Sequence, residues 1–313
     1  MGTHVVIGAG PVGSAVAELL LSRGEQVRVI TRSGSGIDGV EKIAADASDR
    51  ERLVELTHGA EVIYNCVNPP YDRWATEWPP IAAAILAAAE ANGAVLATCG
   101  NLYVYGEVDA PMTESTPMNA TGIKGKVRIA MWTDALKAHQ AGRVRAFEVR
   151  GGDYLGGNSL LGLLVTPALC KGRTAFVPAD VDAPHTWTNV RDVAALMVTG
   201  GTDSRAWGKV WHVPSAPACS LRDLTTIAAA QLSSPTSAVK PKIRSLPYAA
   251  VWLGGLVNPL MKELRETQHQ FRKPFILDSS AAEQTFGLTA TPIEDSVALD
   301  IAQGTTAGMK AGK

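Results

Sequence analysis

Residues 5–20 read VVIGAGPVGSAVAELL, and this stretch decides the fold expected for the chain. A short apolar strand pattern comes first, and the glycines Gly8, Gly10 and Gly13 follow it at the spacing G-x-G-x-x-G. The residues Ser14–Arg23 then show the apolar periodicity of a helix. A glycine in the first position permits a tight turn, and one in the third lets the helix pack closely on its strand. The stretch therefore predicts a strand, a glycine turn and a helix that opens a βαβ unit.

The same glycine turn predicts a binding site for a dinucleotide. Gly10 would let the backbone approach a pyrophosphate, and the helix N-terminus would offer free N–H groups and a positive dipole end. A glycine turn without a ligand is the alternative, but the strand before it and the helix after it favour the binding site. The residues expected to hold the pyrophosphate are Gly8, Gly10, Pro11, Val12 and Gly13.

Residues after the next strands extend the expected cofactor site. An acid at the end of the second strand would accept from the adenosine ribose of NAD, but this chain has Thr31, Arg32 and Ser33 there. Since arginine pairs well with a 2′-phosphate, the pattern favours NADP(H) over NAD(H), unless Arg32 is simply solvated. Loop residues at strand ends often contact ligands, although each could equally be an ordinary loop residue. The candidates are Asp46, near the adenine, and Cys66, Val67 and Asn68, along the cofactor.

Strand and helix patterns alternate over the first half of the chain. Strands are expected at 4–7, 27–31, 43–45, 61–65, 95–98 and 145–150, with helices at 79–91 and 126–141 between them. Capping boxes predict further helix starts, at Ser48 with Glu51 and at Ser220 with Asp223. Alternation of this kind predicts an α/β fold, a Rossmann-type doubly wound parallel sheet. Residues 1–157 would form this dinucleotide-binding core, with about 183–213 returning to it, and 158–182 and 214–313 would form a smaller C-terminal substrate-binding lobe.

Composition narrows the classes of partner. The 313 residues are 46% apolar and carry a formal net charge of −1, with no run of five like charges, which argues against nucleic acid or an anionic membrane. No apolar stretch reaches the roughly 18 residues of a membrane helix, and no signal peptide is evident, so a cytoplasmic protein is expected. The four cysteines form no C-x-x-C pair, so neither disulfides nor a metal site is expected.

Several segments together resemble the extended short-chain dehydrogenase/reductase family, also called NAD-dependent epimerase/dehydratases. Besides the glycine loop and Asp46, they are VIYNCVN at 62–68, NLYVYG at 101–106, RGGDYLG at 150–156 and HTWTNVRDVA at 185–194. The resemblance spans nearly the whole chain and rests on the order and spacing of these pieces. It implies an enzyme that acts on a small molecule, with a sugar epimerase or dehydratase as one outcome, and a homodimer.

The resemblance also implies a catalytic serine or threonine and a Tyr-x-x-x-Lys pair, and here the chain departs from the family. None of its six tyrosines has a lysine four residues later. If Lys126 is the family lysine, the tyrosine position holds Gly122, and the serine position falls near Gly100. The chain therefore resembles an atypical branch that keeps the cofactor site without the standard triad.

Other residues must then supply any chemistry. Tyr103 follows the fifth strand, so its hydroxyl could donate to a substrate carbonyl, or it could be a packing residue. Lys124 and Lys126 could lower a tyrosine pKa or hold a ribose, and either could equally be a solvated residue at a helix start. Thr98 could bond to the substrate or simply end its strand. Further residues expected to face the substrate are Asn101, Tyr154 and His185.

These observations favour an NAD(P)-dependent oxidoreductase. It would move a hydride between NADP(H) and a carbonyl/alcohol or an activated double bond of a small, lipophilic substrate. Two alternatives stay open: a nucleotide-sugar-type epimerase/dehydratase, and a catalytically silent NADP-binding sensor or regulator.

Overall fold

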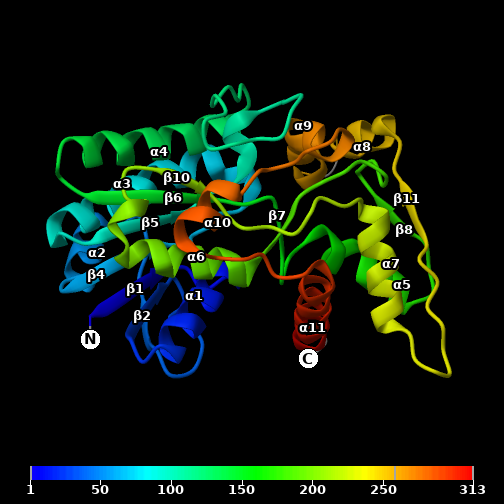
Figure 1. Ribbon diagram of the computed structural model, residues 1–313, viewed down its shortest axis with the longest axis horizontal. Helices are drawn as coiled ribbons and strands as arrows, with labels where there is room; N and C mark the ends of the chain where they lie inside the picture. The colour runs from blue at the N-terminus through cyan, green and yellow to red at the C-terminus, as the bar shows by residue number, and fades with distance from the viewer. Residues whose placement is uncertain (1, 257–258, 312–313) are drawn as a thin grey trace.

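The computed structural model describes residues 2–256 and 259–311, and its centre is a seven-stranded parallel sheet (Figure 1). The strand order is β10-β6-β5-β4-β1-β2-β3. The strands are β1 (Thr3–Ile7), β2 (Gln26–Thr31), β3 (Glu41–Ala44), β4 (Ala60–Asn65), β5 (Val95–Cys99), β6 (Arg145–Arg150) and β10 (Val210–His212). The order reverses between β1 and β4, and ligands bind at such switch points of open parallel sheets. The predicted Rossmann-type doubly wound α/β fold is confirmed.

Helices cover both faces of the sheet, and each face buries its own apolar cluster (Figure 1). One face is covered by α1 (Pro11–Ser22) and α6 (Val190–Thr202), which pack on each other. The other is covered by α2 (Arg50–Leu56), α3 (Trp74–Asn92) and α4 (Ile123–Gln140). The short 3₁₀ turns η1 (Tyr71–Arg73), η2 (Leu102–Tyr105) and η4 (Ser204–Ala206) complete this part. Because both faces of the sheet are buried at its centre, the strands β1, β4 and β5 are largely apolar.

The remaining elements gather beside the sheet and bury a third cluster, which includes Leu161, Leu224 and Val297. Here β8 (Ala175–Val177) pairs with β11 (Ile243–Ser245), and β7 (Asp153–Leu155) pairs with β9 (Trp187–Asn189). The helices are η3 (Leu161–Val165), α5 (Thr166–Cys170), α7 (Leu221–Leu232), α8 (Tyr248–Gly254), α9 (Pro259–Arg272), α10 (Ser280–Phe286) and α11 (Ile293–Ala311). Within the predicted lobe range 214–313, Ala282 of α10 packs in the sheet cluster with α1 and α6.

Four helix starts differ from the sequence expectation. Helix α1 begins at Pro11, not at Ser14. Helix α2 is capped by Asp49, which accepts from the Arg52 backbone, so the capping box predicted at Ser48 is wrong. Helix α3 begins five residues before Pro79 and carries both its prolines inside. Helix α4 begins at Ile123, not at Lys126. The capping box at Ser220 and Asp223 is confirmed.

Candidate active site

The glycine loop after β1 has the shape that a bound pyrophosphate requires. Gly8 has φ +100°, and a Cβ there would lie 2.6 Å from the Cys66 carbonyl oxygen. A Cβ on Gly13 would lie 1.9 Å from the Gly8 carbonyl oxygen, so only glycine allows this approach. In front of Gly10, by contrast, a Cβ would meet no atom within 4 Å. The loop is tightly closed on its inner side and open where a ligand would lie.

The first turn of α1 adds polar groups to this open space. Gly10 is the N-cap, no side chain caps the helix, and Pro11 stands at its first position. Since proline has no N–H, the backbone N–H groups of Val12 and Gly13 are the first that this helix end can offer. A helix N-terminus with open space before it favours an anion. The glycine loop therefore fits the diphosphate of a dinucleotide.

Two cavities of about 600 Å³ each meet at this loop and form one groove, which we call the cofactor groove. The first holds the glycine loop, the end of β2 and the loop after β3. The second runs across the ends of β4 and β5 towards the lobe. The residues common to both are Gly10, Pro11, Arg32, Cys66, Val67, Asn68, Pro69 and Asn158. The groove is thus continuous from the β2–β3 edge to the lobe.

The β2–β3 end of the groove contains every residue predicted to contact the adenosine. Arg32 is exposed and lines both cavities, while Thr31 and Ser33 hydrogen bond to Ser35. Asp46 accepts hydrogen bonds from the backbone and hydroxyl of Ser48, which lower its carboxyl pKa. No carboxylate stands at 31–33 to accept from a ribose hydroxyl.

A loop at 156–158 closes the groove opposite the glycine loop, and the last helix holds it. Gly156, Gly157 and Asn158 all have positive φ angles, of 111°, 116° and 57°. Asp300 of α11 is fully buried and accepts from the backbone N–H of Gly156 and Gly157, at 2.8 and 3.1 Å. Its second oxygen accepts from the Ser159 hydroxyl at 2.8 Å. One carboxylate of the final helix therefore fixes one wall of the groove.

Two phenols mark the substrate end of the groove. The hydroxyls of Tyr71 on η1 and Tyr103 on η2 lie 2.8 Å apart, and both side chains line the groove. Burial raises the pKa of both tyrosines, and it raises that of Tyr103 well above the ordinary value. Both therefore remain protonated at neutral pH. One O–H donates to its neighbour, which leaves the other free to donate to a substrate oxygen.

The cation at this end is an arginine. Arg128 on α4 is only 4% exposed and lines the groove. Its Nη1 donates to the Cys99 carbonyl at 3.1 Å, and the guanidinium lies over the rings of Trp74 and Trp78, 4.9 and 4.6 Å from their centroids. Its charge acts to lower the pKa of Tyr103, but burial outweighs it. The groove thus has a fixed positive charge that cannot titrate.

The two predicted lysines do not lie in the groove. Lys124 is 1% exposed and forms ion pairs with Glu263 and Glu266 of α9. Its ammonium also lies 5.8 Å from the centroid of the Tyr71 ring. The buried charge therefore fastens α9 to α4. Lys126 is exposed on the opposite side of the helix, because it follows Lys124 by two residues, which is about half a helical turn.

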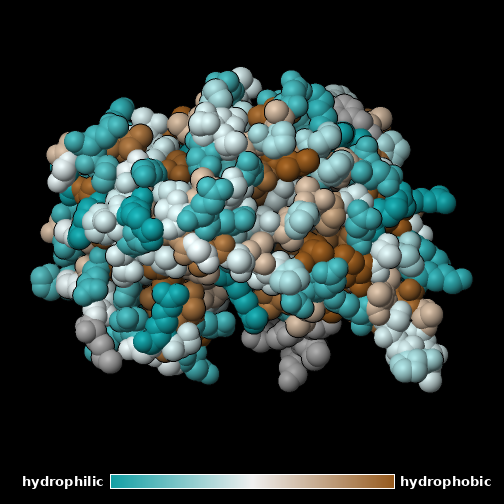
Figure 2. Space-filling model, in the orientation of Figure 1, coloured by the Kyte–Doolittle hydropathy of each residue, from teal (hydrophilic) through white to brown (hydrophobic). Residues whose placement is uncertain are grey.

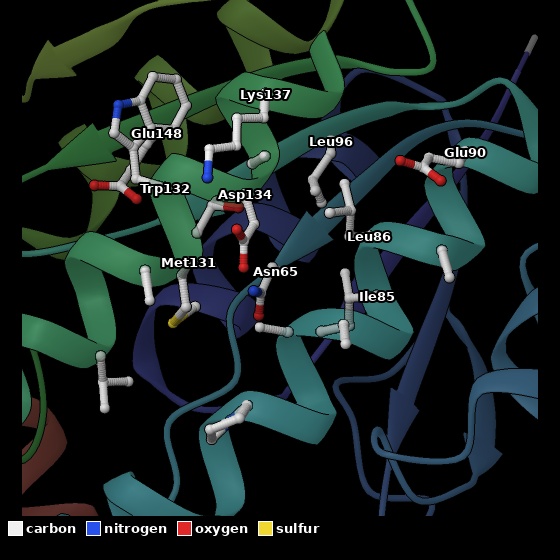
Figure 3. Close-up of a pocket in the computed structure, with 18 of the residues that line it drawn as sticks. Asn65, Ile85, Leu86, Glu90, Leu96, Met131, Trp132, Asp134, Lys137 and Glu148 are labelled. Atoms are coloured by element: carbon white, nitrogen blue, oxygen red, sulfur yellow. The ribbon is translucent and has the colours of Figure 1, made fainter. Parts of the chain in front are cut away.

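Lys126 and Thr98 instead line a separate cavity of about 610 Å³ between α3 and α4 (Figure 3). Figure 3 shows Ile85 and Leu86 of α3 on one side and Met131 and Trp132 of α4 on the other. The glycine loop does not contribute to it. This position does not support the roles predicted for Thr98 and Lys126 at the substrate.

The residues predicted to face the substrate have distinct positions. Asn101 lines the groove and accepts from the Tyr103 backbone N–H. The Tyr154 hydroxyl donates to the Gly100 carbonyl at 2.5 Å and so ties β7 to the end of β5. His185 is 4% exposed and reaches the groove only through Asp153, whose Oδ2 lies 2.5 Å from its Nε2. The nearby Cys66 and Cys99 thiols stay neutral, since burial raises the pKa of both.

The groove residues that the sequence did not predict include three with ionisable side chains, namely Tyr71, Arg128 and Asp153. Arg128 follows Lys124 by four residues, so both lie on one face of α4. The helix expected from the sequence began at Lys126 and did not include Lys124, so this relation could not be recognised. Asp153 stands inside the RGGDYLG segment, and Tyr71 follows the segment at 62–68, so both lay close to quoted motifs.

Neither a membrane-spanning helix nor a metal cluster is found in the described residues. None of the helices within 2–256 and 259–311 is long and apolar enough to cross a bilayer. Over the same ranges, no cluster of three or more His, Cys, Asp or Glu side chains could hold a metal ion.

Solved structures share this fold over almost the full chain. MoeE5, in complex with UDP-glucose and NAD, is 16% identical with a TM-score of 0.77, over 98% of this chain and all of that one. The Bordetella bronchiseptica enzyme WbmH, with NAD⁺, is 19% identical with a TM-score of 0.74, over 98% and 99%. The UDP-glucose-4-epimerase of Stenotrophomonas maltophila is 15% identical with a TM-score of 0.79, over 99% and 100%. At these identities the likeness shows the fold alone.

The sequence matches no functionally curated protein. A family model does match residues 4–209, about two thirds of the chain, and it describes the NAD-dependent epimerase/dehydratase family. The match covers the glycine loop, the groove at the ends of β4 and β5, and α4. The chain therefore belongs to the NAD-dependent epimerase/dehydratase family.

Proposed function

We propose that the protein is an oxidoreductase that uses NADP(H) to reduce a carbonyl or an activated double bond of a small, lipophilic molecule. The observation that carries the proposal is the continuous groove. It joins the glycine loop, whose open side fits a pyrophosphate, to a pocket that contains the neutral phenols of Tyr71 and Tyr103 and the guanidinium of Arg128. The bound nicotinamide would supply the hydride. This chain's own residues would orient the acceptor and supply the proton.

The phenols and Arg128 suit an oxygen that gains negative charge. The free O–H of the Tyr71–Tyr103 pair can donate to a substrate carbonyl, and the guanidinium stabilises the charge that develops there. Leu102, Leu160, Leu163 and Phe275 line the same end of the groove, which favours an apolar substrate body. Figure 2 shows apolar side chains at the surface between the positions of α6 and α7.

Arg32 supports the choice of NADP(H) over NAD(H). It lines both cavities at the adenosine end, and no carboxylate stands beside it at 31–33. A 2′-phosphate would gain charge-assisted hydrogen bonds from its guanidinium. The family description names NAD, and the solved structures above contain NAD, so the preference is a property proposed for this chain.

An epimerase or dehydratase acting on a nucleotide sugar is the second candidate, and family membership favours it. Such reactions begin by oxidising an alcohol, and this step needs a base beside the nicotinamide. Because burial raises the pKa of Tyr71 and Tyr103, neither phenol is suited to be that base. The proposed reductase is therefore preferred.

The test is NADPH consumption with a panel of aldehydes, ketones and enones. We expect turnover with at least one apolar member and a fall of roughly 100- to 1,000-fold in Tyr103→Phe, as for loss of a hydrogen bond to a developing oxyanion. Tyr64→Phe is the matched control, since its hydroxyl bonds His4 outside the groove. Unchanged turnover in Tyr103→Phe would remove Tyr103 from the mechanism. Tight cofactor binding without turnover on any panel member would favour a silent sensor.

A further inference from the structure

Two buried histidines of this protein each place Nδ1 beside a backbone carbonyl, but their Nε2 atoms face different partners. The Nδ1 of His212 lies 2.9 Å from the Asp278 carbonyl, and its Nε2 lies 2.7 Å from the Tyr105 hydroxyl. A neutral ring satisfies both contacts, because Nδ1–H donates to the carbonyl and Nε2 accepts from the phenol. Burial lowers the pKa of His212, in agreement with a neutral ring.

His185 also has both ring nitrogens in hydrogen bonds. Its Nδ1 lies 3.1 Å from the Gln270 carbonyl, and its Nε2 lies 2.5 Å from Oδ2 of Asp153. A carbonyl can only accept, so Nδ1 carries the hydrogen on that side. If the ring were neutral and Asp153 ionised, a lone pair on Nε2 would face a carboxylate oxygen at 2.5 Å. The contact therefore requires one more proton between Nε2 and Oδ2.

The surroundings keep this proton within the pair. The His185 ring packs against Trp187, Phe271 and Phe275, with centroids at 4.6, 5.4 and 5.7 Å. No polar side chain apart from Asp153 bonds to the ring in the described residues. The Asp153 side chain is 27% exposed and lines the cofactor groove. The Asp153–His185 pair is therefore enclosed by the protein except where Asp153 faces the groove.

Other ionisable groups surround the pair without bonding to its shared proton. Tyr71, Tyr103 and Arg128 line the groove on the side of Asp153, and both phenols experience its charge. On the far side, Asp180 lines a small cavity with His185, the Cys219 backbone bonds to that of His185, and the His269 ring contacts Phe275. Asp153 is therefore the route by which a proton can pass from the pair to the groove.

We propose that Asp153 is the catalytic acid of this groove and that His185 is the positioning residue that holds its proton. The inference rests on the proposed reduction. As the substrate carbon takes up a hydride, the C=O π bond breaks and the oxygen forms a bond to the proton leaving Asp153. The substrate is reduced and the cofactor oxidised. The pair is left as a carboxylate and a neutral imidazole, and it regains a proton from water in the groove.

Asp153→Asn tests the shared proton directly. The side-chain amide introduced by this substitution can donate to Nε2 of a neutral ring, so the variant keeps the hydrogen bond and removes the need for the extra proton. NMR of the ¹⁵N-labelled full chain without cofactor should show a far-downfield proton resonance at neutral pH that disappears in Asp153→Asn. His212, with one protonated nitrogen, serves as the internal reference. A His185 ring with one protonated nitrogen and no such resonance in the wild type would overturn the proposal.

Kinetics test the delivery of the proton to the substrate. A general acid contributes roughly 10²- to 10⁴-fold, so kcat of Asp153→Asn should fall at least about 100-fold while KM changes little. Asp180→Asn is the matched control and should behave as wild type. Equal kcat in Asp153→Asn and wild type would refute the catalytic role.

The two readouts separate this inference from the proposed function. If the wild type consumes no NADPH with any panel member but shows the shared-proton resonance, the proposed reduction fails and the proton site stands. If turnover occurs without the resonance, the reduction stands and the role of the pair fails. If Asp153→Asn does not fold, the wild-type spectrum decides alone.

Discussion

Substituting Gly10 by alanine should weaken cofactor binding while leaving the fold intact. Gly10 has φ −72° and ψ −173°, which alanine adopts freely, and its Cβ would meet no protein atom within 4 Å. The new methyl group would project about 1.5 Å into the space proposed for the pyrophosphate. A phosphate oxygen held about 2.9 Å from a backbone N–H would then move out of hydrogen-bonding range. Losing one charge-assisted bond costs about 1.5–3 kcal/mol, so the affinity should fall roughly 10- to 150-fold.

Thermal unfolding with and without NADPH measures this loss. At a concentration of about 100 times Kd, a ligand stabilises the wild type by about 2.7 kcal/mol. At roughly 2–4 °C per kcal/mol, Tm should rise by about 5–10 °C in the wild type. In Gly10→Ala the same ligand concentration supplies only about 0.3–1.4 kcal/mol, so Tm should rise by about 1–6 °C. Without ligand, the two proteins should melt at nearly the same temperature.

Gly13→Ala is the informative contrast to this variant. A Cβ there would lie 1.9 Å from the Gly8 carbonyl oxygen, so the backbone must shift. Overpacking of this kind costs about 1–3 kcal/mol, so Gly13→Ala should melt lower even without cofactor. If Gly10→Ala keeps the full wild-type shift with NADPH, the pyrophosphate does not lie on this loop and the reasoning is refuted.

Three further predictions concern other parts of the molecule. Arg32→Ala should lower the ratio of NADPH to NADH affinity about 10-fold or more, as measured by titration; an unchanged ratio would reject the 2′-phosphate contact. Lys124→Met should lower the free energy of urea unfolding by about 1–3 kcal/mol, less than for a fully buried pair because Glu263 and Glu266 are about a quarter exposed; no loss would mean that the ion pairs do not fasten α9. Burial lowers the pKa of His212, so its stabilising contribution is full above pH 6.5 and is lost as the pH falls below it. His212→Asn should be less stable than the wild type at pH 7.5. Between pH 7.5 and 5.5, however, its free energy of unfolding should fall by about 1 kcal/mol less than that of the wild type. An equal fall in the two proteins would contradict this reasoning.

The sequence predicted the sheet and the cofactor end of the groove because local rules decide them. Gly8 and Gly13 stand where no side chain fits, and the first half alternates strands and helices. The capping box at Ser220 formed because its two members are only three residues apart in the chain. Arg32 and Asp46 were found because they follow strands whose ends meet at one edge.

The substrate end was less predictable because distant segments form it. Nothing near His185 in the sequence indicates that Asp153, on the neighbouring strand, faces its ring. Helix α3 starts before its two prolines, since burial of Trp74 and Trp78 outweighs the lost backbone bonds. On α4, Lys126 and Arg128 are two residues apart and so lie on opposite sides of the helix, and it is Arg128 that faces inward.

The contact between Asp300 and the loop at 156–158 has a consequence for how the protein matures. The strands and glycine loop that form most of the groove lie in the first two thirds of the chain, but the carboxylate that fixes one wall comes from the last helix. A nascent chain can thus form its sheet long before residue 300 leaves the ribosome, yet it lacks a finished groove until then. Cofactor capture should therefore follow the synthesis of α11, and chains truncated before α11 should fold a sheet that holds its dinucleotide weakly.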